Sequence, residues 1–152
     1  MTNLDTYNSK ILQALQADGR ISNIELADRI GLSPSACLRR VQELEKSGII
    51  SGYRAVINFE ALGVGLIAYI AVGLSDHTMP SQTAFETAMQ DCPAVRECHN
   101  ITGLVEVEYM LRVEVADIAA YKAFHADVLG SLSQVNSITT YMVLDSPKND
   151  RG

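Results

Sequence analysis

Two neighbouring arginines, Arg39 and Arg40, are the side chains whose type and surroundings best suit the recognition of an anion or a nucleobase. A guanidinium group holds its N–H donors in one plane, so it can donate two parallel hydrogen bonds to a phosphate or to the O6 and N7 atoms of guanine. An isolated Arg-Arg pair on a helix is more often a solvated face. The elements that carry the pair therefore decide between the two interpretations.

The arginines follow a sequence that marks the start of a helix. Ser33 is expected as the N-cap and Pro34 as the first helical residue, and the small side chains of Ser35 and Ala36 would let the backbone approach base edges. The free N–H groups of a helix N-terminus also favour a phosphate. We expect this helix to run to about Ser47.

The same helix has a predicted inner face. Leu38, Val41 and Leu44 are expected to point inward, while Arg39 and Arg40 stay outside. The two guanidinium groups would then be free to donate to a ligand.

Two earlier helices complete a three-helix unit. Asp5 is the expected N-cap of the first, which ends before Gly19. Ser22 and Glu25 have the spacing of a capping box, so the second helix begins after Ser22 and stops at Gly31. Two short helices joined by a glycine turn are typical of a helix-turn-helix, whose second helix enters the major groove of DNA.

We therefore expect this unit to bind double-stranded DNA. One of Arg39 and Arg40 would pair with guanine and the other, or Ser33, would anchor a phosphate; the sequence leaves the assignment open. The residues expected to contact DNA are Ser22, Asn23, Ser33, Pro34, Ser35, Ala36, Arg39 and Arg40.

The distribution of charge divides the chain of 152 residues, whose net charge is −6. Residues 1–52 carry six basic and six acidic side chains, whereas residues 53–152 carry six basic and twelve acidic ones. Only the first part can approach a phosphate backbone without a long-range penalty. Residues 49–57 are rich in β-formers and include Gly52, which predicts a short hairpin or an extended linker.

The second part of the chain has the pattern of an α+β domain. In chain order we expect a strand over 66–74, a helix from Pro80 to Pro93, strands over 95–101 and 107–115, a helix capped by Asp117 and a strand over 135–144. The third strand alternates apolar and polar residues, so one of its faces is expected to be much wetter than the other. The order β-α-β-β-α-β predicts a ferredoxin-like sandwich with both helices on one face of an antiparallel sheet.

The expected fold class is thus α+β with three segments. A helix-turn-helix, winged-helix-like domain over 1–52 is joined by an extended hinge over 53–65 to a ferredoxin-like domain over 66–152. Because the strand over 66–74 is apolar on both sides, the open face of the sheet needs a partner, and a second copy of the chain is the simplest one. A homodimer would also present two recognition helices to palindromic half-sites.

Other classes of protein receive little support from the sequence. Cys37, Cys92 and Cys98 lack the spacing of a disulfide scaffold or a zinc site, and no nucleophile-base pair or Gly-rich phosphate loop is evident. We therefore expect no enzyme activity, no metal and no cofactor. No stretch reads as a signal peptide or a membrane span, so we expect no membrane partner and a cytoplasmic, nucleoid-associated protein.

Three motifs resemble the Lrp/AsnC family of transcription regulators over nearly the whole chain. The motifs are residues 18–23 with 31–41, then Glu97-Cys98-His99 followed by Thr102-Gly103, and finally the closing residues 140–144. The resemblance implies a second domain that senses an amino acid and oligomerises, with dimers that assemble further into tetramers or octamers. It also implies effector binding between subunits, near the turn after the second strand.

Carried onto this sequence, the resemblance implicates the backbone of Thr102 and Gly103 for a ligand carboxylate and two acidic side chains for its ammonium group. The turn is two residues longer here than in the family pattern, a shift that preserves strand parity. The expected effector-binding residues are Thr102, Gly103, Leu104, Glu106, Glu108 and Tyr141. A solvated strand face is the alternative for Glu106 and Glu108.

The expected function is a sequence-specific, DNA-binding transcription regulator modulated by an amino acid or a related small molecule. One alternative is an architectural protein that organises DNA without a ligand response. A second is an enzyme, because siroheme decarboxylases resemble the family in both domains; however, the sequence has no cluster of His and Arg suited to a carboxylated tetrapyrrole.

Overall fold

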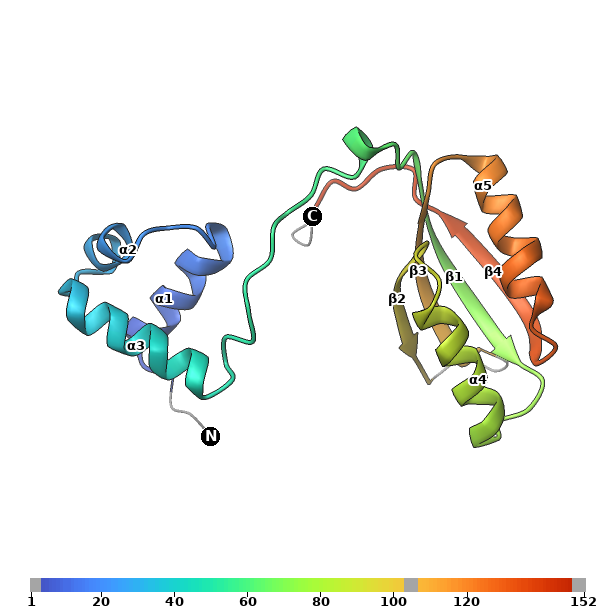
Figure 1. The fold of residues 1–152 in the computed structure, drawn as a ribbon, viewed down its shortest axis with the longest axis horizontal. Coiled ribbons are helices and arrows are strands. Elements are labelled where there is room, and N and C mark those ends of the chain that lie inside the picture. Colours follow the sequence, from blue (N-terminus) through green and yellow to red (C-terminus); the bar gives the residue numbers. More distant parts are fainter. Residues whose placement is uncertain (1–3, 103–106, 149–152) are drawn as a thin grey trace. The chain divides into compact units, whose positions relative to one another are not determined.

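A computed structural model describes residues 4–102 and 107–148. The chain divides into two compact units, of which the first ends at Val56 and the second begins at Ile57 (Figure 1). This division falls inside the segment 53–65, for which a linker is expected.

Three helices build the first unit: α1 (Thr6–Ala17), α2 (Asn23–Ile30) and α3 (Pro34–Lys46). The predicted caps are confirmed. The Asp5 side chain accepts a hydrogen bond from the backbone N–H of Asn8 at 2.8 Å, and Ser22 and Glu25 form both halves of a capping box. Gly31 ends α2 in the left-handed conformation, with φ at 77°, which an L side chain adopts only with strain.

The core of the first unit contains Ile11, Leu26, Ile30, Cys37 and Leu44, all of them buried. Cys37 occupies the place on the inner face of α3 that was expected for Leu38.

The expected orientation of two α3 residues is wrong. Leu38 is 46% exposed and lies outside the buried cluster. The Arg40 side chain, expected to lie outside, is only 24% exposed. Both differences follow from helical periodicity, because Cys37 and Leu44 fix the buried face and Arg40 stands between them.

The residues after α3 form no wing. From Ile49 to Ile57 the chain has no strand, so the alternative of a short hairpin is wrong and the extended linker describes this segment. Ile49 and Ile50 still pack against the first unit's core, and the Tyr53 hydroxyl donates to Glu45 at 2.9 Å. These contacts hold the start of the segment against the helices without any strand pairing.

The second unit is a four-stranded antiparallel sheet with two helical segments (Figure 1). After a 3₁₀ turn, η1 (Glu60–Leu62), its elements are β1 (Leu66–Leu74), α4 (Met79–Gln90), β2 (Val95–Asn100), β3 (Tyr109–Val115), α5 (Ile118–Ala123) and β4 (Val135–Met142). The strands lie in the order β2-β3-β1-β4, so β1 is the central strand that its apolar sequence predicts. A π-helical turn (Phe124–Val128) and a 3₁₀ turn (Leu129–Ser131) continue α5.

Both helical segments cover one face of this sheet. Ile70 on β1 and Leu111 on β3 pack with Phe85 from α4 and with Phe124 and Leu129 from the segment that continues α5. Side chains alternate along a strand, so the residues between the core positions point to the opposite face. The βαββαβ sandwich predicted from the sequence is confirmed.

The prediction that one face of β3 is exposed to solvent is wrong at Glu114. Its side chain is 2% exposed and lies between the guanidinium groups of Arg96 and Arg112, at 3.0 and 2.5 Å. A buried carboxylate requires such partners, because burying an unpaired charge costs roughly several kcal/mol of folding free energy. This ion cluster takes the place of solvent on that face.

Candidate functional site

The turn between α2 and α3 is held by polar side chains from the predicted DNA-binding set. The Asn23 amide donates to the Pro34 carbonyl at 2.9 Å and so ties the start of α2 to the start of α3. Ser22 is occupied by its capping box with Glu25. These two side chains fix the geometry of the helix pair, which is a different task from contacting a ligand.

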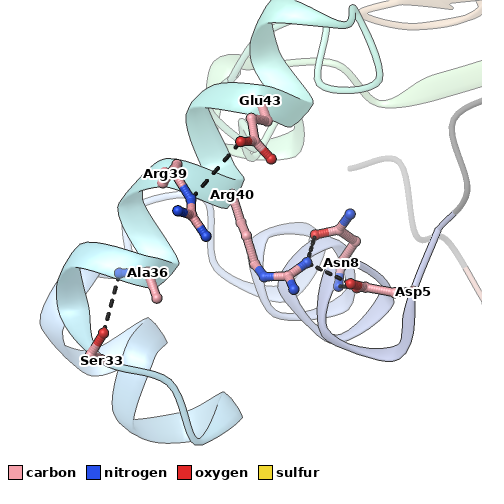
Figure 2. A network of polar contacts seen from close by, with 7 residues as sticks. All are labelled: Asp5, Asn8, Ser33, Ala36, Arg39, Arg40 and Glu43. Atoms are coloured by element: carbon pink, nitrogen blue, oxygen red, sulfur yellow. Dashed lines mark hydrogen bonds and ion pairs between the residues drawn. The ribbon is translucent and has the colours of Figure 1, made fainter.

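The first turn of α3 is built as its sequence predicts. The Ser33 hydroxyl accepts from the Ala36 N–H at 3.3 Å (Figure 2). Pro34 is the first residue of the helix. Ser35 is exposed and Ala36 is half-buried. The small side chains of this turn leave the helix N-terminus accessible to a large anionic partner, and the helix dipole favours such a partner there.

Arg39 and Arg40 have different roles in the structure. The Arg39 side chain is 73% exposed, and its Nε lies 4.0 Å from Oε1 of Glu43, one turn further along α3. Arg40 Nη1 donates to Asp5 Oδ2 at 2.7 Å and to Asn8 Oδ1 at 2.9 Å (Figure 2). Of these two arginines, Arg39 is therefore the one whose donors are largely open to a ligand.

Arg40 connects α3 to the N-cap of α1. Its guanidinium carbon also lies 5.4 Å from the centre of the Tyr7 ring, a cation–π contact. The pKa of Asp5 is held below its ordinary value, first by the backbone N–H of Asn8 and then by the hydrogen bond from Arg40. Asp5 is thus charged at neutral pH and bridges the two helices.

The predicted effector residues are only partly within the described part of the chain. Gly103, Leu104 and Glu106 lie outside it. Thr102 is exposed two residues after the end of β2, and Glu108 lies close by, because the Ile101 N–H donates to the Glu108 carbonyl at 2.7 Å.

Tyr141 lies apart from these residues. It is 56% exposed on β4, where it pairs with Tyr69, whereas the backbone N–H of Glu108 donates to Val72, which pairs with Ile138. Three strand residues therefore separate Tyr141 from the level of Glu108, about 10 Å along the strand.

Glu108 is neither solvated nor free. Its Oε2 accepts from the Leu74 N–H at 2.7 Å, and its Oε1 lies 3.0 Å from Nδ1 of His77. The side chain is 14% exposed, so the alternative of a solvated strand face is wrong for this residue. The carboxylate secures the end of β1, and a ligand ammonium group would have to share it with His77.

Sequence reasoning missed the cluster of Arg96, Arg112 and Glu114. The Arg96 guanidinium carbon also lies 4.4 Å from the centre of the Phe59 ring. Arg112 and Glu114 line an open groove of about 760 Å³, together with Phe59, Glu60 and residues 143–146. Charged residues two apart on a strand share one face, and that spacing of Arg112 and Glu114 is the signal that could have revealed the pair.

Two other kinds of site find no support among residues 4–102 and 107–148. Within these ranges no group of His, Cys, Asp or Glu could hold a metal ion. No helix there is long and apolar enough to cross a bilayer.

A capped helix-turn-helix followed by a ferredoxin-like domain defines a class of DNA-binding regulators. Two family models match this chain: winged helix-turn-helix DNA-binding over residues 4–51 and the Lrp/AsnC ligand-binding domain over residues 67–152. The chain is 39% identical over 145 residues to the leucine-responsive regulatory protein of Escherichia coli K12, covering 95% of this chain and 87% of that protein.

Solved structures agree with this assignment. A transcriptional regulator from Neisseria meningitidis, solved as a complex with L-Met, is 36% identical with a TM-score of 0.91, over 97% of this chain and 94% of that one. A feast or famine regulatory protein from M. tuberculosis, complexed with L-methionine, is 33% identical with a TM-score of 0.83, over 98% and 97% of the two chains.

The chain belongs to the Lrp/AsnC family. It is a DNA-binding transcription regulator with a ligand-binding domain, and it is not an enzyme.

Proposed function

We propose that this regulator recognises specific DNA sequences through α3, with Arg39 as its principal donor to a base. The observation that carries the proposal is the contrast between the two arginines: Arg39 is 73% exposed, whereas the side chain of Arg40 is occupied by Asp5 and Asn8. Ser35 and Ala36 in the first turn allow the helix to approach the groove closely. Ser22, Asn23, Ser33, Pro34 and Arg40 support this contact by holding α3 in place, and backbone N–H groups at its start would face a phosphate.

The test is equilibrium binding of the purified full chain to DNA from upstream of its own gene and to a scrambled duplex of equal length, over a salt series. Sequence-specific recognition predicts a preference of about 10³-fold or more for the upstream DNA at physiological salt. Equal affinity for the two duplexes would overturn this proposal and favour an architectural role.

We infer that the second unit binds a free amino acid. The support comes from the relatives from Neisseria meningitidis and M. tuberculosis, each solved with L-methionine, and from the match to a ligand-binding domain. The proposed contacts are the turn after β2, which includes Thr102, Gly103, Leu104 and Glu106, with Glu108 beside it and Tyr141 contributed from another subunit. Such a ligand would favour one subunit packing over another and thereby change the spacing of the recognition helices.

Isothermal titration calorimetry of the full chain with L-methionine, L-leucine and D-methionine tests this inference. Saturable binding of an L-amino acid that weakens in Glu108→Gln would support it. His77→Ala serves as a control, because it removes the imidazole that contacts Glu108 and leaves the Glu108 side chain itself unchanged. Absence of heat with every amino acid, together with unchanged DNA affinity, would refute it.

We further propose that the open face of the sheet forms a homodimer, which can assemble into tetramers or octamers on the bacterial nucleoid. Tyr69 and Tyr141 pair side by side on β1 and β4 and are 41% and 56% exposed on this face. Aromatic side chains in such a position are typical of an interface. In sedimentation equilibrium, Tyr69→Asp should lower the mass of the assembly. The control Ile118→Asp, at an exposed apolar position on α5, should keep the wild-type mass. Equal masses for Tyr69→Asp and the wild type would contradict the proposal.

A further inference from the structure

The outward face of α3 presents two side chains that the predicted DNA-binding set does not include. Leu38 is 46% exposed, and Gln42, one turn later, is exposed as well. Leu38 is three residues after Ser35 and four before Gln42, so these side chains lie one above another along the helix. Arg39 lies beside them on the neighbouring row.

This stripe faces away from the unit's core. Cys37 and Leu44, the two α3 residues that are fully buried, lie on the opposite side of the helix. A leucine in this position adds apolar surface to a helix face that otherwise carries polar and charged residues. Packing in the core does not explain a leucine at this position, because Leu38 does not belong to the cluster that contains Cys37, Val41 and Leu44.

We propose that Leu38 and Gln42 are specificity-determining residues that contact base edges beside Arg39. The primary amide of Gln42 has one donor and one acceptor at the spacing of adenine N6 and N7, so it selects adenine. Leu38 has no hydrogen-bonding group, and its methyl groups suit the C5-methyl group of thymine. The inference rests on the proposed function of α3 as the helix that reads DNA.

The length of the stripe fixes how much sequence it covers. Ser35 and Gln42 are seven residues apart, which corresponds to about 10 Å along a helix. At roughly 3.4 Å for each base pair, this distance covers about three successive base pairs. Each half-site should therefore contain a short run with one guanine, read by Arg39, and neighbouring A·T pairs, read by Leu38 and Gln42.

The experiment begins with selection of preferred duplexes from random DNA by the full wild-type chain. The selected site is then synthesised with single-base analogues at each A·T pair. Uracil in place of thymine removes only the C5-methyl group, and 7-deazaadenine removes only the N7 acceptor. Affinities are measured for the wild type and for Leu38→Ala and Gln42→Ala.

Matched controls carry the same substitutions elsewhere. Gln13→Ala changes an exposed glutamine on α1, and Leu62→Ala changes a leucine that is 71% exposed in the second unit. Both should keep the wild-type affinity and the wild-type response to every analogue.

At one position, uracil should weaken wild-type binding about fourfold, the value of one buried methyl group, and should have no effect on Leu38→Ala. At another, 7-deazaadenine should weaken wild-type binding about fivefold or more and should have no effect on Gln42→Ala. If a specific site is selected but both variants respond to the analogues like the wild type, this inference fails and the proposed function stands. If no sequence is enriched, the proposed function itself fails, and this inference fails with it.

Discussion

Replacing Arg39 with alanine should weaken specific DNA binding while leaving the first unit folded. The side chain is 73% exposed, and its ion pair with Glu43, at 4.0 Å, joins residues one turn apart on α3. Such pairs contribute only about 0.3–0.5 kcal/mol, and alanine is at least as good a helix former as arginine. A bidentate contact with guanine contributes about 1–3 kcal/mol, which is about a 5- to 150-fold change in affinity. The effect on DNA binding should therefore exceed the effect on folding.

Fluorescence anisotropy on a preferred and a scrambled duplex, at several salt concentrations, distinguishes the kinds of contact. If Arg39 pairs with a base, Arg39→Ala loses affinity mainly for the preferred duplex. If it contacts only a phosphate, both duplexes bind more weakly and the slope of log affinity against log salt falls by about 0.9. Unchanged affinity for both duplexes would refute the assignment of Arg39 as a DNA contact.

Comparison of Arg40→Ala with Arg39→Ala separates a positioning role from direct contact with DNA. Arg40→Ala removes the contacts of α3 with Asp5, Asn8 and the Tyr7 ring, so it should lower the melting temperature of the first unit. Arg39→Ala should leave that temperature unchanged. A weaker DNA complex for Arg40→Ala with an unchanged melting temperature would contradict the positioning role of Arg40.

Three further predictions concern stability and reactivity. Glu114→Gln removes a charge that is 2% exposed between two arginines and should destabilise the second unit by about 3 kcal/mol in urea denaturation; a loss below about 1 kcal/mol would contradict the buried ion cluster. Hydrogen bonds from Ser22 lower the pKa of Glu25 from its ordinary value of 4.5. Their contribution to the stability of the first unit is therefore present above about pH 4.5 and is lost as the pH falls through the lower folded pKa. Thermal melts from pH 3 to 7 should show a smaller acid destabilisation in Glu25→Gln than in the wild type. Burial, and then the charge of Glu86, raises the pKa of the Cys98 thiol to about 11. Because the smaller thiolate fraction is partly offset by the higher nucleophilicity of a more basic thiolate, iodoacetamide at pH 8 should modify Cys98 about tenfold more slowly than a thiol of ordinary pKa 9.0. Equal rates in peptide mass spectra would be inconsistent with that burial.

The elements that the sequence predicted best are those whose cause is local. Asp5, Ser22 and Ser33 cap their helices through contacts with residues three positions away, and the sequence shows such spacing directly. The same holds for Asp117, whose side chain accepts from the Ala120 N–H at 2.8 Å. The order and type of the strands followed from their alternation and from the turns between them.

The errors concern side chains whose partners are distant in the sequence. Arg40 is bound by Asp5 and Asn8, and nothing in the pattern of α3 shows that α1 begins beside it. Part of the signal was nevertheless present: Arg40 stands three residues after Cys37 and four before Leu44, a spacing that places it on the buried face. The cysteine, small and buried, identifies that face better than Leu38 does.

The buried position of Glu114 also depended on tertiary contacts. Its alternation along β3 predicts only that it shares a face with Arg112. Arg96, which comes from β2, completes the cluster, and the pairing of β2 with β3 is not readable from either strand alone. Glu108, which the sequence predicts as an effector contact, has the same property, because its carboxylate contacts Leu74 and His77, more than thirty positions earlier in the chain.

Recognition of DNA by α3 from the major groove is tested most directly by dimethyl sulfate interference on the preferred site. This reagent methylates guanine N7 in the major groove and adenine N3 in the minor groove. The structure predicts that N7 methylation of the guanine facing Arg39 prevents binding of the wild-type chain, and that Arg39→Ala no longer responds to methylation at that base. Interference confined to adenine N3, or the same guanine interference in Arg39→Ala, would contradict recognition of the major groove by this helix.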